Sequence, residues 1–386
     1  MGKSNLDSAS SEPYSGRASL MRFLMLNWRD PGNPLAGGAE RVSLGYLAAL
    51  AERGHEVYWF ANAFPECSST DDYEGVRVVR GGGVGTSILA ARRWVRRQAS
   101  FDLIIDQHHG LPWFAPWWGG TRTVAYIHEV LGPIWQSFYG WPWSRLGEFV
   151  ERNLIRWYRN TPFWSACPST ETALRKLGVK EVELIPYGVS TRPLDPLPEK
   201  RITGPVRLAV VSRLAPNKRI EHAVDGVAEL LSRGVEVRLS IVGDGEVRPF
   251  LEERVQTRGV ADIVQFVGRL GEGEKDQLLA DSHLLLHTSV REGWGLNVIE
   301  ANCMGTPSVV YPVPGLIEST LHEQTGIVVA EESPVALADG VERFIADPAL
   351  YESCRQSAVR RGAEFHWDQV TSRACDWLEL VARGDA

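Results

Sequence analysis

The sequence is poor in several features that mark whole classes of protein. Its five cysteines include no C-x-x-C pair, so neither a disulfide framework nor a zinc pattern is indicated, and free thiols of a reducing cytosol are the simpler interpretation. No apolar run reaches the roughly 18 residues that a membrane-spanning helix needs. The net charge of -7 argues against a general nucleic-acid binder. We therefore expect a cytoplasmic globular protein with no nucleic-acid partner.

The length and the termini bound the domain organisation. A chain of 386 residues is long enough for two domains, each with its own core. Residues 1–19 are rich in small polar types and lack the apolar stretch of a signal peptide, so they are expected to form a disordered leader. Folded sequence is expected from residue 20 onward.

The first half alternates between apolar runs and an amphipathic segment. An apolar run at residues 22–27 ends in a glycine- and proline-rich loop, a helix is predicted over 39–53, and another strand over 57–60. Strand, glycine loop, helix and strand are typical of a parallel sheet. Further strands are predicted at the segments 76–79, 102–106 and 123–127.

The second half repeats this alternation after a change in composition. Residues 191–205, TRPLDPLPEKRITGP, hold four prolines and no periodicity, which indicates an interdomain linker. The predicted strands that follow are 206–211, 237–242, 263–267, 284–287 and 308–311. The predicted helices between them are 220–232, 248–258, 274–281 and 297–304.

Together these patterns predict an α/β protein with two Rossmann-like, doubly wound domains that face each other across a cleft. The N-terminal domain is expected over residues 20–190 and the C-terminal domain over 206–365. Residues 366–386 are expected to form a helix that packs back toward the N-terminal domain. Ligands of such sheets bind at the carboxyl ends of the strands, so the cleft is the expected active site.

The most informative segment is Arg291–Ala301, REGWGLNVIEA. Its Gly-Trp-Gly stretch predicts a turn that lets the backbone approach a ligand, followed by a helix N-terminus whose free N–H groups suit a diphosphate. Glu300, one turn into the helix, can accept from two vicinal hydroxyls such as those of a ribose, whereas Glu292 faces the cleft. On these residues alone, two solvated carboxylates at a helix start remain an alternative.

Three further features lie at predicted strand ends. Arg213 and Lys218 follow the first strand of the second half, where two cations can neutralise a diphosphate without a metal. Gly37 and Gly38 form the first strand-to-helix turn, which lacks the G-x-G-x-x-G pattern of dinucleotide binders. His128 follows the strand 123–127, and the pair His108-His109 is placed similarly but is more ambiguous. Surface cations, a plain turn and structural histidines are the respective alternatives.

In combination these residues resemble glycosyltransferase family 4, whose members are retaining, nucleotide-sugar-dependent enzymes of the GT-B fold. The resemblance runs from about residue 21 to the C-terminus. Its strongest parts are SRLAPNK at 212–218, VGDG at 242–245, FVGR at 266–269 and EGWGLNVIEA at 292–301. The order and spacing of four motifs make the resemblance specific, although His128 is followed by Glu129 where many family members have aspartate.

The resemblance implies a role for each of these positions. The catalytic set would be Glu292, His128, Arg213 and Lys218. The donor-binding set would be Gly38, Arg213, Lys218, Gly243, Gly268, Arg269, Gly295, Leu296, Asn297, Val298 and Glu300. Glu292 would contact the transferred sugar and Glu300 the nucleotide ribose. No metal and no cofactor are expected, and the implied mechanism is front-face displacement with retention of configuration.

The implied reaction moves a hexosyl group from a UDP- or GDP-sugar to a glycan or lipid-linked acceptor. A sugar-nucleotide epimerase or a glycan phosphorylase on the same fold stays open, although no cofactor lysine for a pyridoxal-type phosphorylase can be placed. A degenerate, nucleotide-sugar-binding regulator is a further alternative.

The N-terminal half is rich in tryptophan and arginine. Eleven of the 14 tryptophans precede the linker, and the grouped ones are Trp113, Trp117, Trp118, Trp135, Trp141, Trp143, Trp157 and Trp164. Arginines are interleaved at positions 92, 93, 96, 97, 145, 152, 156 and 159. This combination suits a membrane surface, so peripheral contact with an anionic membrane is our hypothesis. Aromatic core packing with solvated arginines is the alternative.

Overall fold

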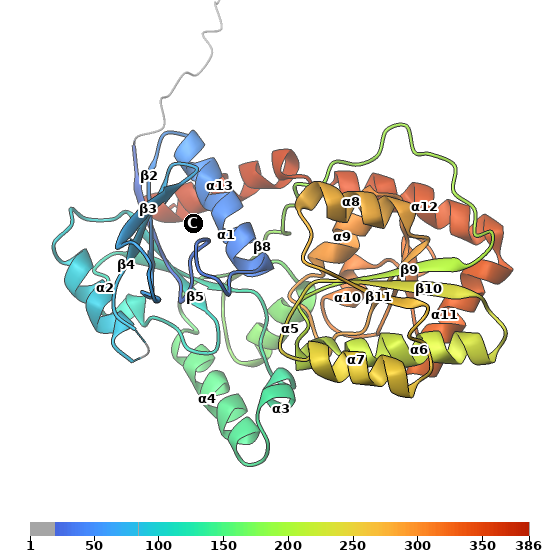
Figure 1. Cartoon of the computed structure of the whole chain (residues 1–386). Coiled ribbons are helices and arrows are strands. Elements are labelled where there is room, and N and C mark those ends of the chain that lie inside the picture. The colour runs from blue at the N-terminus through green and yellow to red at the C-terminus, as the bar shows by residue number, and fades with distance from the viewer. Residues whose placement is uncertain (1–19, 84, 386) are drawn as a thin grey trace, which may run out of the picture.

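The computed structural model describes residues 20–83 and 85–385, which form two α/β units joined by a connecting segment (Figure 1). The expected leader, residues 1–19, lies outside the described residues. Within the described part of the chain, no helix combines the length and the apolar character needed to cross a bilayer.

The N-terminal unit is built on an eight-stranded sheet of order β3-β4-β2-β1-β5-β6-β7-β8. Its strands are β1 Arg22–Leu26, β2 Glu56–Ala61, β3 Thr70–Tyr73, β4 Val76–Arg80, β5 Leu103–His108, β6 Arg122–Ile127, β7 Phe163–Ser165 and β8 Val182–Leu184. Every neighbouring pair is parallel except β3 and β4, which form an antiparallel pair at one edge. The central strands β1 and β5 are almost entirely buried, as expected for a parallel sheet covered on both faces.

Helices and short turns connect these strands. They are α1 Gly38–Glu52, α2 Ser87–Val95, the 3₁₀ turn Ala115–Trp117, α3 Ile134–Phe138, α4 Trp143–Trp157 and α5 Pro168–Lys176. Helix α1 packs on β2 and β4, whereas α3 and α4 form a hairpin that projects at the lower edge of Figure 1.

The C-terminal unit is built on a six-stranded, all-parallel sheet of order β11-β10-β9-β12-β13-β14. Its strands are β9 Val206–Val211, β10 Val237–Val242, β11 Val264–Gly268, β12 Leu284–His287, β13 Ser308–Val310 and β14 Gly326–Val328. Its helices are α6 Ile220–Ser232, α7 Arg248–Thr257, α8 Glu272–Asp281, α9 Leu296–Cys303, α10 Leu316–Ser319, α11 Pro334–Ala346 and α12 Pro348–Ala363. Helices α8, α9 and α12 cover one face of the sheet, and α6, α7 and α11 cover the other (Figure 1).

The strand and helix predictions for the second half match the structure to within two residues at each end; for example, α6 spans Ile220–Ser232. Periodicity did not indicate β3, β7, β8, α2, α3, α4 and α5 of the first half, nor β14, α10, α11 and α12 of the second half. Strands β7 and β8 have three residues each, too few to show a period, and α4 carries apolar residues on its solvent side as well as on its buried side.

The last helix, α13 Trp367–Arg383, crosses from the C-terminal unit back to the N-terminal unit. Its first residue, Trp367, lies against Gly45 and Gly188, where a Cβ atom would come within 2.6 Å and 2.3 Å of the indole ring. Arg53 of the loop after α1 then pairs with Asp376 at 2.6 Å and Glu379 at 2.8 Å. The helix therefore connects the C-terminal unit to the N-terminal unit.

Candidate active site

The two units touch where the carboxyl ends of their sheets face each other. A Cβ atom at Gly38, the first residue of α1, would lie 3.2 Å from the side chain of Leu296 at the start of α9. A Cβ atom at Gly293 would lie 2.9 Å from the carbonyl oxygen of His128. Because both positions are glycine, the N-terminal unit can contact the Arg291–Ala301 segment of the C-terminal unit closely. The contacting parts of the N-terminal unit are the Gly37-Gly38 turn and the residue after β6.

Glu292 is held by three side chains of its own unit. Its carboxylate forms an ion pair with the Lys218 ammonium at 2.5 Å and accepts a hydrogen bond from the Ser289 hydroxyl at 2.6 Å. The ring of His287 lies 3.5 Å away and is neutral at pH 7, because burial lowers its pKa to about 4. Although burial alone raises the pKa of Glu292, the charge of Lys218 brings it below its usual value. Glu292 is therefore an ionised carboxylate fixed in one orientation.

The backbone around Glu292 leads into α9. The N–H of Glu292 donates to Pro314 at 3.0 Å, and Gly315, at φ +85°, packs directly on the Glu292 carbonyl. Gly295 caps the helix in the left-handed region at φ +87°, a conformation that costs glycine nothing. The first N–H groups of a helix have no intrahelical partner, but that of Val298 donates to Gly295 at 3.0 Å. The backbone donors left for an anion are therefore those of Leu296 and Asn297.

Glu300 lies one turn further along α9 and is engaged by a lysine that sequence reasoning missed. The ammonium of Lys275, on α8, lies 2.8 Å from Glu300 and 2.6 Å from Glu272. Burial lowers the pKa of Lys275, but the two carboxylates outweigh it and raise the pKa above its usual value. The second oxygen of Glu272 pairs with Arg41 on α1. A chain of four alternating charges thus runs from the N-terminal unit to Glu300.

The loop after β9 carries the two predicted phosphate ligands. Lys218 points at Glu292, whereas Arg213 is exposed and has no carboxylate within ion-pair distance among residues 20–83 and 85–385. The loop is shaped by Gly243, where a Cβ atom would lie 1.9 Å from the Ser212 carbonyl, and by Asn297, whose amide donates to Val211 at 2.6 Å. The absence of a side chain at Gly243 therefore allows close packing against the backbone of Ser212. Contact between Gly243 and the donor stays a prediction.

Gly268 and Arg269 lie at the end of β11, beside the same loop. Gly268 has φ +81° and open space where a Cβ atom would be, and its carbonyl accepts from Gly243 at 2.7 Å. Arg269 is exposed. Both residues belong to the donor-binding set that the resemblance implies, and their contact with the donor stays a prediction.

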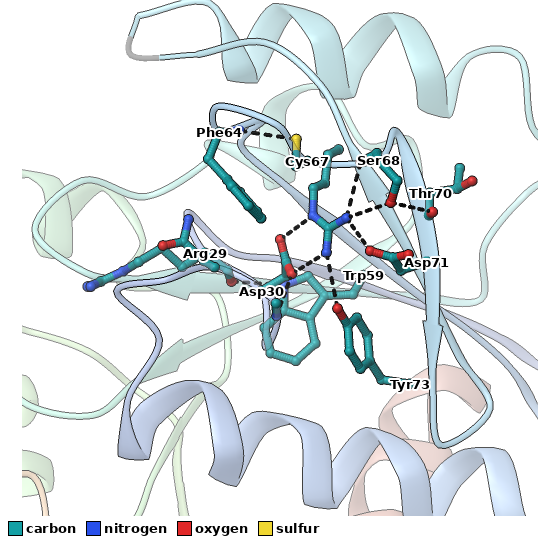
Figure 2. Close-up of polar contacts among 12 residues, drawn as sticks. Arg29, Asp30, Trp59, Phe64, Cys67, Ser68, Thr70, Asp71 and Tyr73 are labelled. Atoms are coloured by element: carbon teal, nitrogen blue, oxygen red, sulfur yellow. Dashed lines mark hydrogen bonds and ion pairs between the residues drawn. The ribbon is translucent and has the colours of Figure 1, made fainter. Parts of the chain in front are cut away.

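The glycine turn of the N-terminal unit is anchored by a buried ion pair. The Arg80 guanidinium donates to both oxygens of Asp30, at 2.7 and 2.6 Å, and both side chains are almost completely buried. Figure 2 shows Asp30, Ser68, Asp71 and Tyr73 gathered around this guanidinium. Asp30 also accepts from the Gly32 N–H at 2.8 Å, so the base of the loop before α1 is fixed.

The adjacent Arg29 fixes the far side of the same loop. Its guanidinium donates to the Leu35 carbonyl at 3.0 Å and lies 3.4 Å from Glu40 and 3.5 Å from the His109 ring. Glu40 in turn accepts from the N–H of Gly37 at 2.7 Å. These contacts hold the Gly37-Gly38 turn against α9. Of the histidine pair, His109 faces this site, and His108 is buried beneath it with a pKa of about 3 because of burial.

His128 is buried at the end of β6 with both ring nitrogens engaged. Its Nε2 lies 2.7 Å from the Gln107 amide, and its Nδ1 is hydrogen-bonded to the Tyr187 hydroxyl. Burial lowers the pKa of His128 to about 3, so the ring is neutral. The structure places His128 next to Gly293, but contact between its ring and a sugar requires one of these hydrogen bonds to open.

Glu129 is the next residue, and it faces the C-terminal unit. Its Oε2 lies 4.0 Å from the Arg291 Nε, and neither atom has a hydrogen-bond partner in the described part of the chain although both are buried. Burial raises the pKa of Glu129 to about 7, and the charge of Glu292 adds to the effect. Two carboxylates with opposite pKa shifts therefore face each other across the domain interface.

Several residues of this site carried no sequence signal. Lys275, Glu272 and Arg41 belong to no motif, and Ser289 precedes the Arg291–Ala301 segment without a recognisable pattern. The pairing of Tyr187 with His128 spans 59 positions and depends on tertiary structure alone. Glu129 was recognisable only as the neighbour of His128. Its partner Arg291 is the first residue of the Arg291–Ala301 segment.

No group of three His, Cys, Asp or Glu side chains suited to a metal ion occurs among the residues that the structure describes. That the reaction needs no metal remains a prediction, because either cationic side chains or a metal ion can neutralise the charge of a diphosphate.

Comparison with known proteins now defines the class. The family model for glycosyl transferases group 1 matches residues 197–361, and that for glycosyltransferase family 4 matches residues 36–192. Sucrose-phosphate synthase of Thermosynechococcus elongatus superposes with a TM-score of 0.75 at 21% identity, over 92% of this chain and 97% of that one. Anabaena HepE in complex with UDP-glucose superposes with a TM-score of 0.72 at 20% identity, over 93% and 99% of the two chains. The fold is that of the GT-B glycosyltransferases.

Curated relatives agree with this class. Glycogen synthase of Mycobacterium tuberculosis is 25% identical over 398 aligned positions, which cover 95% of this chain and 96% of that protein. Alpha-D-kanosaminyltransferase of Streptomyces kanamyceticus is 30% identical over 173 positions, or 45% and 42% of the two chains. The chain belongs to glycosyltransferase family 4 and is a glycosyltransferase.

Proposed function

We propose that this enzyme transfers a hexosyl group from a UDP- or GDP-sugar to a glycan or lipid-linked acceptor, with retention of configuration and without a metal. The observation that carries the proposal is the ion pair of Glu292 with Lys218 at 2.5 Å, next to the free N–H groups at the start of α9. An anionic group that faces the sugar and a cation that faces the phosphate are thereby fixed beside each other.

The donor diphosphate would lie between the loop after β9 and the N-terminus of α9. Arg213 is available for it without breaking an ion pair, and Lys218 would contact the phosphate while it stays beside Glu292. Helix N-termini favour phosphate through their free N–H groups and their dipole. Glu300 would accept hydrogen bonds from the ribose hydroxyls. UDP-glucose bound to HepE is consistent with a nucleotide-sugar donor for this fold.

The chemical step we propose is displacement on one face of the sugar. The bond between the anomeric carbon and the phosphate oxygen breaks, the acceptor oxygen bonds to the same face of that carbon, and the acceptor proton passes to the leaving phosphate. Arg213 and Lys218 stabilise the negative charge that develops on the phosphate. Glu292 orients the sugar hydroxyls and does not bond to the anomeric carbon.

The acceptor would approach from the N-terminal unit, past Glu129 and the Gly37-Gly38 turn. Glu129 offers an oxygen that has no hydrogen-bond partner among the described residues, and this oxygen can accept from an acceptor hydroxyl. We also propose that the enzyme is cytoplasmic and that its N-terminal half makes peripheral contact with an anionic membrane, which would bring it to a lipid-linked acceptor.

A thermal-shift screen of UDP-, GDP-, ADP- and dTDP-sugars tests the proposal. A ligand at 100 times its dissociation constant adds about 2.7 kcal/mol to the unfolding free energy. Glu300→Ala should abolish the shift that the wild type shows. No shift with any of the four nucleotide sugars would contradict the proposal.

Turnover assays separate the alternatives. An epimerase would convert a sugar nucleotide with no acceptor present, and a phosphorylase would require inorganic phosphate. A binding regulator would show the thermal shift but no turnover with any acceptor. A retaining transferase is supported only if the product bond keeps the anomeric configuration of the donor.

A further inference from the structure

Helix α4 exposes its apolar side to solvent. Trp143 is 66% exposed, Phe149 64% and Trp157 63%, and Leu146 and Val150 are exposed as well. These positions repeat at the three- and four-residue spacing of one helix face. The loop that leads into α4 adds Trp141, which at 84% is the most exposed large apolar side chain among the described residues. We call this set the α4 outer face.

The inner side of α4 carries buried glutamates together with the apolar Leu154 and Ile155, so the helix has apolar residues on both sides. Glu148 and Glu151 are buried there. Glu151 accepts hydrogen bonds from the N–H groups of Leu131 and Gly132 at 2.7 and 3.2 Å and from the Trp135 indole at 3.1 Å. The inner side is thus already packed and hydrogen-bonded within the N-terminal unit, and the apolar outer face is a second, separate surface of the helix.

The exposed charge around the outer face is of one sign. Residues 131–160 contain two carboxylates, Glu148 and Glu151, and both are buried. The four arginines of the same segment are all exposed, and they are Arg145, Arg152, Arg156 and Arg159. Arg156 and Arg159 border a groove of about 810 Å³ that Phe114, Trp117 and Trp157 also line. Arg156 and Arg159 form no ion pair within the described ranges 20–83 and 85–385.

We propose that the α4 outer face is a membrane-docking surface that lies in the headgroup region of a bilayer containing anionic lipid. Tryptophan prefers the boundary between headgroups and acyl chains, and arginine side chains reach from an apolar surface to the phosphates. Basic residues near an anionic bilayer add electrostatic attraction to its surface. A contiguous exposed apolar surface of this kind is rare on proteins without such a partner.

The hairpin is placed to link a membrane to the active site. Its first helix, α3, begins five residues after Glu129 and contacts the 3₁₀ turn Pro216–Lys218 of the C-terminal unit. An acceptor held at the bilayer would therefore be presented next to both Glu129 and the donor loop. This consequence rests on the proposed transfer reaction, whereas the docking surface itself does not.

Vesicle flotation with the full-length protein tests the docking surface. Wild-type protein should float with vesicles of phosphatidylcholine and phosphatidylglycerol, float less with pure phosphatidylcholine, and be released as salt screens the arginines. Absence of flotation with the anionic vesicles would overturn the proposal. The thermal shift with nucleotide sugars, measured on the same sample, reports separately on the proposed transferase function.

Two groups of substitutions locate the surface. The triple variant Trp141→Ser, Trp143→Ser, Phe149→Ser should lose flotation, and Arg156→Glu with Arg159→Glu should weaken vesicle partitioning at least about tenfold. Matched controls are Phe250→Ser on α7, which is 50% exposed, and Arg360→Glu on α12. Unchanged melting temperatures and nucleotide responses would show that all variants are folded.

Two results would contradict this assignment. Flotation of the triple variant equal to that of the wild type would place membrane contact elsewhere on the molecule. Self-association of the wild type in the absence of lipid, lost in the triple variant, would make the outer face an interface with a second copy of this chain.

Discussion

The Lys275 ammonium lies 2.8 Å from the Glu300 carboxylate, and both side chains are buried between α8 and α9. Glu300 is the residue assigned to the nucleotide ribose, and Lys275 also contacts Glu272, which pairs with Arg41 of the opposite unit. Lys275 therefore sets the orientation of Glu300 and connects it to the N-terminal unit. We regard it as a positioning residue.

Replacing this lysine should affect both stability and nucleotide binding. Lys275→Met leaves the buried Glu300 carboxylate without its cation, so the unfolding free energy should fall by about 3–5 kcal/mol. Urea unfolding measures this loss, and calorimetry with nucleotide should show weaker binding. Lys275→Arg should restore most of the binding. The exposed pair Arg343–Glu323 supplies the control, because Arg343→Met should change stability by less than about 1 kcal/mol.

A methyl group at Gly293 should separate the two units. Its Cβ atom would lie 2.9 Å from the His128 carbonyl, which is too near for any real contact, so the interface must shift. A displacement of about 1 Å at a reaction centre can reduce turnover about a hundredfold. We expect a large loss of kcat for Gly293→Ala with nucleotide affinity preserved. Gly273→Ala, which meets no atom within 4 Å, should leave kcat unchanged.

Glu292→Gln should separate binding from chemistry. The amide still accepts from Ser289 but carries no charge, so Lys218 is released toward the donor phosphate. Nucleotide binding should stay unchanged or tighten, whereas kcat should fall about a hundredfold because the sugar is no longer held in its reactive orientation. Isothermal titration and initial rates with the same donor measure the two effects. Equal losses of binding and turnover would assign Glu292 to the nucleotide instead.

The pH dependence of stability should report on Glu129. Its pKa is about 7 in the folded protein and 4.5 in an ordinary carboxyl, so the folded state holds the proton more tightly between these values. The contribution of Glu129 to the unfolding free energy therefore falls as pH rises from 4.5 to 7, and it is constant above that window. Glu129→Gln removes this contribution. Relative to the variant, the wild type should lose stability across the window in urea titrations. A constant difference would show that Glu129 titrates normally.

The buried pair beneath the glycine turn should dominate the stability of the N-terminal unit. Arg80→Met leaves Asp30 charged, buried and unpaired, and it should cost about 3–5 kcal/mol in urea unfolding. Arg77→Met on the same strand removes an exposed guanidinium that donates to Tyr58 at 3.1 Å. It should cost no more than about 1.5 kcal/mol. If both variants lost similar amounts of unfolding free energy, the buried pair would contribute no more to stability than the hydrogen bond of Arg77.

The sequence alone determined the alternation of strands and helices from residue 206 to residue 311, because most of these elements are long enough to show their period. It also determined that Glu292 and Glu300 flank a glycine turn and a helix start, since spacing along one segment fixes both. The residues 212–218 and 242–245 could be placed at strand ends for the same reason. Family 4 membership followed from the order of these motifs.

The tertiary structure decided which residues contact each other in the site. The chain from Arg41 to Glu300 and the approach of Glu129 to Arg291 join residues far apart in sequence, and no local pattern encodes such distances. The composition gives the number of tryptophans but not which of them are buried. Trp113 and Trp164 are fully buried, whereas Trp141 and Trp143 face solvent. Burial depends on what packs against a side chain, and that is fixed only when both units and α13 are folded together.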